Sequence, residues 1–505
     1  MTVADAIVRH LRDASVRAIF GVPGGGSNLD IIAAAARIGL PFVLTATETA
    51  GAIAAIAQAE VTGCAGACLT GLGPGAASVV NGVACALLDR APLIVITDAH
   101  PASADGATHQ RIDQHALFAP ITKWSATLTP DRVDTIMIEA IQRAMTSPRG
   151  PVHLECPADV AGVSHQASGV SPTSAGVGRP TTEDWRSTTA RKPLAIAGLG
   201  ARRHAEAVRA FVAAYRVPAM VTYKAKGVVS DRDPWFAGVY TNGALEREIA
   251  DESDLVIAVG LDRVELLPRP WTPRQPLVDI AEDVAPALER LGPQLQSTWD
   301  GSALSRTVTR QRERLGTSRA AMTAADVVRI ASTKLPNPRV TVDAGAHMFP
   351  ATLLWPIDEP GGMLISNGLS TMGFALPAAT GAALLDRGRT VVALTGDGGL
   401  LMCCGELATL ARERLNVVVI VFNDRSLSLI DVKQRQRGHA RTGVALGNVS
   451  WQELAHAYGL ESYVAETADQ FERAISVAAA CRGPCLIDAR VDPMPYEEMI
   501  RHVRG

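Results

Sequence analysis

The sequence predicts an α/β fold of three domains built on parallel β-sheets, and three observations support this prediction. Residues 391–394 and 417–422 are short apolar runs rich in β-branched residues, and residues 401–415 between them carry apolar residues at helical spacing. This pattern predicts a strand, helix, strand crossover. Strand and helix patterns also alternate between residues 18 and 97, as they do in parallel sheets. Finally, 505 residues exceed what one core usually holds, and three domains of ordinary size fit that length.

The N-terminal part of the chain, residues 1–165, begins with an amphipathic helix and continues with alternating elements. The helix pattern at residues 3–13 has a polar face, unlike the apolar core of a signal peptide. We expect strands at 18–21, 42–47, 66–69 and 93–97, and helices at 28–36, 49–61 and 76–88. Glycine-rich turns at 23–27 and 71–76 follow the first and third of these strands.

Residues 164–190 are rich in Ser, Thr, Gly and Pro, a composition typical of a linker. Strand patterns follow at 194–197, 219–223, 255–259 and 277–280, with helices between them. The turn at Gly198 and Gly200 resembles part of a dinucleotide fingerprint. However, its third glycine is missing and no acid ends the next strand, so the turn is weak evidence for a nucleotide site.

The C-terminal part begins near residue 323, after a charged stretch at 310–319. A strand at 340–342 leads into Asp343, and the crossover at 390–426 follows it. The chain closes with a strand at 485–491 and a short tail, which leaves little sequence for a long C-terminal lid.

The composition excludes several classes of protein. A formal charge of −3 and a pI near 6.4 give no sign of a nucleic-acid partner, and no apolar run approaches the roughly 18 residues of a membrane span. The eight cysteines have no His or Cys partners at zinc-site spacing. They are expected to behave as small hydrophobic residues in a reducing cytoplasm.

The crossover at 390–426 carries acids where its two strands end. Ligands of parallel sheets bind beyond the carboxyl ends of strands, and those ends carry Asp397 and Asp424. Mg²⁺ usually takes one or two protein carboxylates together with phosphate oxygens. The main-chain oxygen of Ser426 is a third candidate ligand, and the amides of Gly398 and Gly399 at a helix start suit phosphates. The alternative is that GDGG is only a tight turn and Asp424 an ordinary strand-end residue.

A GDG sequence, a helix, an apolar strand and then an Asn-Asp pair resemble the metal and diphosphate signature of thiamine diphosphate (ThDP) enzymes. Over nearly its whole length the chain resembles the acetolactate synthase and benzaldehyde lyase group of 2-oxo acid decarboxylases and carboligases. It departs from many relatives at Asp424, where they have Asn; the extra charge favours a hard cation.

This resemblance implies three doubly wound parallel-sheet domains with ThDP and Mg²⁺ as cofactors. The expected boundaries are 1–165 for the pyrimidine-binding domain, 166–190 for the linker, 191–318 for the central domain and 319–505 for the diphosphate-binding domain. FAD-binding relatives carry an Arg-Phe-Asp-Asp pattern where this chain has residues 260–265, GLDRVE. We therefore expect a reduced central domain without FAD.

In the first domain the resemblance assigns a catalytic role to Glu48. By position alone, Glu48 is an acid in the first turn of a helix, favoured there by the helix dipole. The resemblance implies instead that it protonates the aminopyrimidine of ThDP and so helps the cofactor to lose its thiazolium proton. Gly73, Pro74 and Gly75 then form part of the pyrimidine pocket. Gln110 matches a family glutamine that hydrogen-bonds an intermediate, and the neighbouring loop residue His109 is either catalytic or merely solvated.

In the last domain the resemblance places further residues around the cofactor and the substrate. Met372, in a segment that also holds Ser370, matches the bulky residue that supports bent ThDP; by itself a Met is usually core packing. Leu427, Leu429 and Ile430 would narrow the substrate pocket. The remaining candidates flank the diphosphate and are Gly345, Ala346, His347, Gly396, Gly398 and Gly399.

Three functions are consistent with these residues. The first is decarboxylation of a small 2-oxo acid, followed by carboligation to an aldehyde or second oxo acid, or by protonation. The second is cleavage of 2-hydroxy ketones, and the third is a catalytically silent ThDP-binding subunit, against which the retained acids argue. In this superfamily two chains meet at each active site, so we expect a cytoplasmic homodimer or homotetramer.

Overall fold

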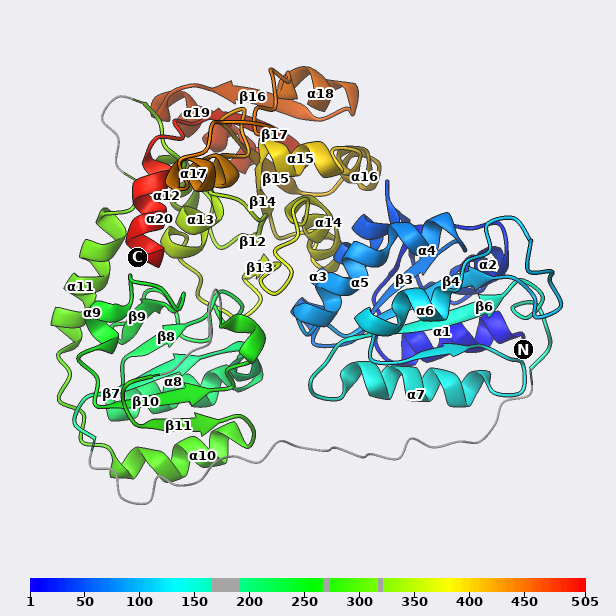
Figure 1. Ribbon diagram of the computed structural model, residues 1–505, viewed down its shortest axis with the longest axis horizontal. Coiled ribbons are helices and arrows are strands. Elements are labelled where there is room, and N and C mark those ends of the chain that lie inside the picture. The colour runs from blue at the N-terminus through cyan, green and yellow to red at the C-terminus, as the bar shows by residue number, and fades with distance from the viewer. Residues whose placement is uncertain (166–189, 267–272, 317–320) are drawn as a thin grey trace. The chain divides into compact units, whose positions relative to one another are not determined.

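The computed structural model describes residues 1–165, 190–266, 273–316 and 321–505, and Figure 1 labels their helices and strands. The chain divides into two compact units. The first comprises Met1–Val177, Gly368–Val391 and Met402–Val417, and the second comprises Gly178–Asn367, Val392–Leu401 and Val418–Gly505. Of the linker expected at 166–190, residues 166–189 lie outside the described residues.

Three parallel sheets confirm the predicted α/β fold class. The first sheet has the strand order β2-β1-β3-β4-β6-β5, and its strands pair in parallel. Its strands are β1 (Ile19–Val22), β2 (Phe42–Leu44), β3 (Gly66–Thr70), β4 (Leu93–Ala99), β5 (Ser125–Thr127) and β6 (Pro151–Pro157).

Helices cover both faces of this first sheet. Apolar residues of α1, α2 and α7 form one core with β3, β4 and β6, whereas α3 packs against β1, β3 and α5. Since alternate residues of a strand point to opposite faces, this is the doubly wound arrangement. The helices of the first unit are α1 (Val3–Asp13), α2 (Ser27–Arg37), α3 (Glu48–Thr62), α4 (Pro74–Ser78), α5 (Val80–Leu88), α6 (Gln114–Phe118), η1 (Ala119–Ile121), α7 (Val133–Met145), α14 (Ala375–Leu385) and α16 (Glu406–Glu413).

The second sheet has the order β11-β10-β7-β8-β9, and Figure 1 shows α8 and α10 beside its strands. The strands are β7 (Pro193–Ala197), β8 (Ala219–Val221), β9 (Phe236–Val239), β10 (Leu255–Val259) and β11 (Leu277–Ile280). The helices are η2 (Leu199–His204), α8 (Ala205–Tyr215), α9 (Arg247–Ala250), η3 (Arg263–Glu265), α10 (Val284–Leu291), η4 (Gly292–Gln294) and α11 (Gly301–Glu313).

The third sheet has the order β13-β12-β14-β15-β17-β16. Its strands are β12 (Arg339–Val342), β13 (Met363–Ile365), β14 (Val391–Gly396), β15 (Val417–Asn423), β16 (Glu461–Ala465) and β17 (Cys485–Arg490). The associated helices are α12 (Ala324–Lys334), α13 (Met348–Leu354), α15 (Asp397–Cys403), α17 (Ser428–Gln436), α18 (Trp451–Ala457), α19 (Ala468–Ala480) and α20 (Pro495–Arg504). The chain steps to opposite sides of β12 when it makes β13 and β14, so the topological switch point, where ligands bind in such sheets, lies between β12 and β14.

Several predicted elements need correction. β2 ends at Leu44 rather than at residue 47, because the amides of Ala46 and Thr47 donate to Glu406 instead of to a neighbouring strand. The crossover helix is two helices: α15 begins at Asp397 and ends at Cys403, and α16 begins at Glu406. The predicted helix at 76–88 is likewise divided into α4 and α5. The short tail expected after the last strand includes α20, which buries Tyr496, Met499 and Val503.

Two further properties concern the whole described chain. Its eight cysteines are free, and Cys68, Cys85, Cys156 and Cys485 are buried as small hydrophobic residues usually are. Among the described helices, none is both long and apolar enough to cross a membrane.

Candidate active site

Glu48 lies at the start of α3, beside the turn that leads into α4. The hydroxyl of Thr47 caps α3 by accepting a hydrogen bond from the amide of Ala50 at 3.2 Å. A Cβ added to Gly75 would lie 3.4 Å from Oε1 of Glu48 and 2.6 Å from Oγ1 of Thr70. The structure therefore brings the candidate acid and the glycine turn together, with little room between them for anything larger than a hydrogen on Gly75.

Gln110 belongs to the same group. Gly73 has a φ of +57°, and a Cβ there would lie 2.4 Å from the carbonyl oxygen of Gln110. Gln110 itself has a φ of +61°, an uncommon conformation for a residue with a side chain. Gln110 and His109 are both exposed, and the carbonyl of His109 accepts a hydrogen bond from the ring of His100 at 2.9 Å. This loop therefore presents the Gln110 side chain beside Gly73, Pro74 and Gly75.

Ser370 and Met372 lie in the turn before α14. The turn is fastened to α5 and the residue after it: the amide of Gly368 donates to Asp89 at 2.8 Å, and the hydroxyl of Thr371 donates to Asn81 at 3.3 Å. Ser370 is exposed with a φ of +55°, and Met372 is half-buried. A half-buried Met in a fixed turn fits either a supporting role or simple packing.

Asp397 and Asp424 lie together at the ends of β14 and β15 in the second unit. Oδ2 of Asp397 accepts the amide of Arg425 at 2.6 Å, and Oδ1 of Asp424 accepts the amide of Ser426 at 3.0 Å. Burial raises the pKa of Asp397 to about 6. Burial, and then the charge of Asp397, raise the pKa of Asp424 to about 7. Two carboxylates, one buried and one half-buried, whose like charges disfavour each other form a good setting for a divalent cation.

His347 lies beside this pair and presents a buried nitrogen without a hydrogen bond. Its ring stacks on Phe422 of β15, with centroids 5.0 Å apart, and a Cβ added to Gly396 would lie 3.2 Å from the ring. Burial lowers the pKa of His347 to about 4, so the imidazole is neutral near pH 7. Within the described residues its Nε2 has no partner, as expected of a polar group that awaits a ligand.

The residues present therefore fit a diphosphate held through a divalent cation. Gly345 is packed against the His347 ring, and Ala346 between them is buried. Gly398 and Gly399 fall in the first turn of α15, where the amide of Gly398 donates to Oδ1 of Asp397 at 2.8 Å. Among the described residues, no group of three or more His, Cys, Asp and Glu suits a metal, so a cation at the two acids would complete its shell with main-chain, cofactor or water oxygens.

The apolar candidates lie at the start of α17. Leu427 is its N-cap residue and Leu429 is half-buried against the core, whereas Ile430 is 44% exposed. The amide of Leu427 donates to the carbonyl of Val444 at 2.8 Å, which ties the residues after Asp424 to a following segment. Asp431 of α17 is paired with Arg435 and Arg441.

The glycine turn of the second sheet is filled by the chain itself. Gly198 and Gly200 approach Gly260 across the switch point of that sheet, and the buried carboxylate of Glu265 accepts the amide of Leu199 at 2.8 Å and that of Asp262 at 3.0 Å. Burial raises the pKa of Glu265 to about 7. A carboxylate thus occupies the place where a phosphate lies in dinucleotide-binding turns.

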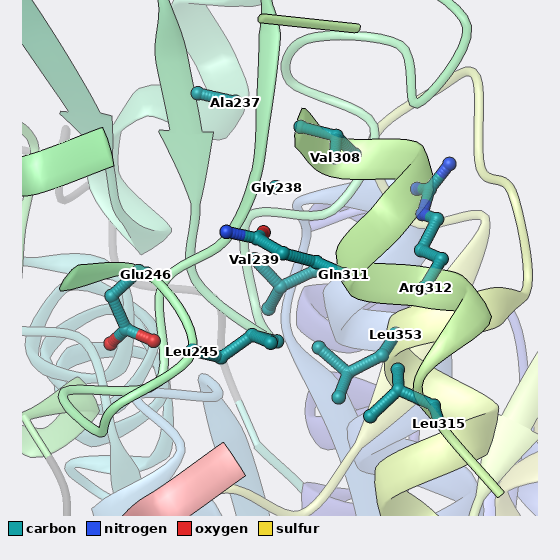
Figure 2. A pocket seen from close by; sticks show the side chains of 10 residues that line it. All are labelled: Ala237, Gly238, Val239, Leu245, Glu246, Val308, Gln311, Arg312, Leu315 and Leu353. Carbon is teal, nitrogen blue, oxygen red and sulfur yellow. The ribbon is translucent and has the colours of Figure 1, made fainter. Parts of the chain in front are cut away.

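Figure 2 shows a cavity near α11 that we exclude as the active site. Its volume of about 20 Å³ has room for about one water molecule. The lining residues are Ala237, Gly238, Val239, Leu245, Glu246, Val308, Gln311, Arg312, Leu315 and Leu353. Glu246 turns its carboxylate to the amides of Thr241 and Gly243, at 3.0 and 2.8 Å.

Sequence reasoning missed three residues at these sites. Asp343, directly after β12, is fully buried, and its carboxylate accepts the hydroxyl of Thr395 at 2.9 Å beside Gly399. The rule that selected Asp397, an acid at a strand end, would also have selected it. Phe422 and Glu406 carry no such signal, because their roles depend on partners far away in the sequence.

The chain is similar to known proteins over nearly its full length. Three families match it: Thiamine pyrophosphate enzyme, N-terminal TPP binding domain, over residues 1–117; the central domain of these enzymes over 188–294; and their C-terminal TPP binding domain over 343–489. A probable 2-ketoarginine decarboxylase of Pseudomonas aeruginosa is 30% identical, with 97% of this chain and 94% of the relative covered. The acetolactate synthase isozyme 2 large subunit of Escherichia coli is 29% identical, with 98% and 96% covered. An acetolactate synthase of Bacillus subtilis is 27% identical, with 97% and 93% covered.

Proposed function

The chain belongs to the thiamine pyrophosphate enzyme family, and we propose that it uses ThDP and Mg²⁺ to decarboxylate a small 2-oxo acid. What remains of the donor after CO₂ is lost either forms a bond to an aldehyde or to a second 2-oxo acid, or takes up a proton. The observation that carries this proposal is the pair of Asp397, which is buried, and Asp424, which is half-buried, at the ends of β14 and β15, each with a raised pKa. Together they supply a site for a divalent cation, through which a diphosphate is held.

The candidate residues form two sets with separate tasks. The first set is Glu48 and Gln110 in the first unit, and the second is Asp397, Asp424, Ser426 and His347 in the second unit. Asp397, Asp424 and the main-chain oxygen of Ser426 hold Mg²⁺, and the diphosphate is held through that cation with His347 beside it. ThDP, when bound, supplies a nucleophilic thiazolium carbon and an electron sink for the bond to the departing carboxylate. Glu48 holds a proton at the pyrimidine ring, and Gln110 offers its amide to the reacting groups.

The donor is a small 2-oxo acid without a second charged group, such as pyruvate. The start of α17 presents Leu427, Leu429 and Ile430, and the acid that follows, Asp431, is paired within the chain with Arg435 and Arg441. Because these two arginines already offset the charge of Asp431, we expect it to bind the guanidinium of 2-ketoarginine, the compound named for one relative, only weakly. An apolar pocket separates donors by only about 1–3 kcal/mol per methylene, so selectivity among short donors is modest.

The test is CO₂ release and product analysis with pyruvate, 2-oxobutyrate, 2-oxoglutarate and 2-ketoarginine, each with and without an aldehyde acceptor. A 2-hydroxy ketone is included as a substrate for cleavage. We expect ThDP- and Mg²⁺-dependent CO₂ release that is highest for the short donors. A preference above about tenfold in kcat/KM for 2-oxoglutarate or 2-ketoarginine, about 1.4 kcal/mol, contradicts the apolar pocket. Cleavage without decarboxylation identifies a lyase, and cofactor binding without any turnover identifies a silent subunit.

Replacing Leu429 with Ala is expected to enlarge the pocket and move the preference toward longer or aromatic 2-oxo acids. The ratio of kcat/KM for phenylpyruvate to that for pyruvate should rise about fivefold or more, since the isopropyl group removed from the Leu side chain occupies the space of several methylenes. Val477→Ala, at an apolar residue of α19 that is 49% exposed, is the matched control. An unchanged ratio in Leu429→Ala would place Leu429 outside the pocket.

The proposal extends to assembly and location. We propose a homodimer as the smallest active form, with a tetramer as a further possibility, and the cytoplasm as the compartment. Eight free cysteines, four of them buried, are consistent with a reducing environment.

A further inference from the structure

The corner between β2 and α3 is held to the sheet only at its first residue, where the amide of Thr45 donates to the carbonyl of Gly21 at 3.1 Å, and by side chains beyond it. β2 ends at Leu44 and α3 begins at Glu48. The hydroxyl of Thr45 donates to the carbonyl of Thr47 at 2.8 Å, and the hydroxyl of Thr47 caps the helix. The three residues before Glu48 therefore form a fixed turn, and the direction of that turn sets where Glu48 starts.

Glu406, the first residue of α16, engages the same turn. Its Oε1 accepts the amide of Ala46 at 2.7 Å and the amide of Thr47 at 3.3 Å. The side chain comes from a segment some 360 residues away in sequence, yet only 1% of Glu406 is exposed. A Cβ added to Gly405 would lie 3.0 Å from Cβ of Ala46, so the start of α16 is in close contact with the corner.

A second contact from α16 reaches the other end of the corner. Arg412 donates a hydrogen bond to the carbonyl of Leu44. The last residue of β2 and the two amides before Glu48 are thus bound by one helix. Since α16 is rigid, it fixes both ends of the corner at once.

A buried carboxylate is costly unless strong donors meet it. Burial raises the pKa of Glu406, and that rise is opposed by Thr409, by the amides of Ala46 and Thr47 and by the charge of Arg412. The chain therefore keeps a buried acid despite its cost in free energy. Its carboxylate accepts the amides of the two residues directly before Glu48. An apolar residue would pack there at lower cost, but it would leave both amides without an acceptor.

We propose that Glu406 is a positioning residue for Glu48. It acts by holding the amides of Ala46 and Thr47, so that the carboxylate of Glu48 stays beside Gly75. This inference rests on the proposed function, because it takes Glu48 as the acid that serves the cofactor.

The first measurement needs no cofactor. Amide hydrogen exchange of the apo protein, followed by mass spectrometry of a peptide covering residues 45–50, is compared in the wild type, Glu406→Ala, Glu406→Gln and Glu139→Ala. Glu406→Ala should lose protection at the amides of Ala46 and Thr47, and Glu406→Gln, which keeps an acceptor oxygen, should retain most of it. Glu139→Ala removes the same side chain from α7, where Glu139 pairs with Arg143, and should match the wild type.

The second measurement follows proton exchange at the thiazolium carbon of bound ThDP, with ThDP affinity measured by calorimetry in parallel. Glu406→Ala should slow proton exchange by about tenfold or more, within the range of general acid–base effects, while ThDP affinity stays within about threefold of the wild type. In a Glu48→Gln background, Glu406→Ala should add almost nothing, because the acid that it positions is already gone. If Glu406→Ala does not fold, Glu406→Asp replaces it, since the shorter side chain withdraws the acceptor and keeps the charge.

The outcomes separate the inference from the proposed function. Wild-type proton exchange in Glu406→Ala, together with slow exchange in Glu48→Gln, overturns the inference and leaves the function standing. An equal, additive loss in both backgrounds also overturns it, because a merely structural role lowers both. Proton exchange that is unaffected by Glu48→Gln overturns the role of Glu48, and the inference with it.

Discussion

Replacing Glu48 of the first set should affect a different property from replacing Asp397 or Asp424 of the second set. Asp397→Ala or Asp424→Ala removes a charged cation ligand and should lower Mg²⁺-dependent ThDP affinity by about tenfold or more. Glu48→Gln keeps the shape of the side chain and lies in the other set, so ThDP affinity should stay nearly unchanged while thiazolium proton exchange slows. Calorimetry with and without Mg²⁺, set against proton-exchange rates, distinguishes the two. Equal loss of affinity in all three variants would show that the division of tasks is wrong.

Glu265 offers a pH-dependent prediction outside the active site. Burial raises its pKa in the folded chain to about 7, whereas an unfolded Glu titrates near 4.3. Below pH 4 both states are protonated and the stability that this group contributes is fully present. As the pH rises toward 7, only the unfolded chain releases the proton, so the folded state loses up to about 3 kcal/mol.

Glu265→Gln should remove this loss, because the amide stays neutral at every pH. The variant should therefore gain thermal stability relative to the wild type between pH 5 and pH 8, measured as the difference in Tm at each pH. Glu206→Gln, an exposed acid on α8, is the control and should show no such trend. A Tm difference that does not change with pH would mean that Glu265 is ionised throughout, held by the amides of Leu199 and Asp262.

At the level of elements, patterns that depend on neighbours in the sequence were predicted well. The residue ranges of α1, β10 and β11 agree with the prediction, since each has a clean helical or strand pattern. β5, β6 and β9 were not predicted; β5 is only Ser-Ala-Thr at a sheet edge, and β9 contains a glycine with positive φ. The tail carries Pro at the helix start and basic residues in its last turn, which are helix signals.

Elements whose ends are set by distant residues could not be predicted. Thr45 and Thr47 suit a strand by their branched side chains, yet β2 stops at Leu44 because Glu406 takes the amides of Ala46 and Thr47. The same limit applies to the site. The candidate acids Asp397 and Asp424 and the glycine turns follow from local motifs. The stacking of His347 on Phe422, and the carboxylate of Glu265 that fills the turn after β7, depend on the folded chain.

The packing of α3 against α14 yields a prediction at this scale. Gly381 lets the two helices touch: a Cβ there would lie 2.1 Å from the carbonyl oxygen of Ala54, and Nε2 of Gln58 donates to the carbonyl of Gly381 at 3.1 Å. Gly381→Ala should force the helices apart and destabilise the protein by about 1–3 kcal/mol, visible as a lower Tm. Gly388→Ala, where a Cβ meets only the side chain of Asp386 at 3.3 Å, should change Tm little. A Gly381→Ala protein as stable as the wild type would contradict this close contact.

For the whole molecule, the two candidate sets belong to different compact units of one chain, Glu48 to the first and Asp397 to the second. If each active site takes Glu48 from one subunit and Asp397 from its partner, then mixing Glu48→Gln and Asp397→Ala chains regenerates one intact site in every hybrid dimer. Random exchange at equal amounts should restore about a quarter of the wild-type sites, since half of the dimers are hybrids and each has one intact site.

CO₂ release after subunit exchange, with exchange verified by differently tagged chains, measures the recovery. Each variant exchanged with itself is the control and should stay inactive. If exchange is complete and no activity returns, both acids of a site come from one subunit. The sharing of a site between subunits would then give no reason for a homodimer to be the smallest active form.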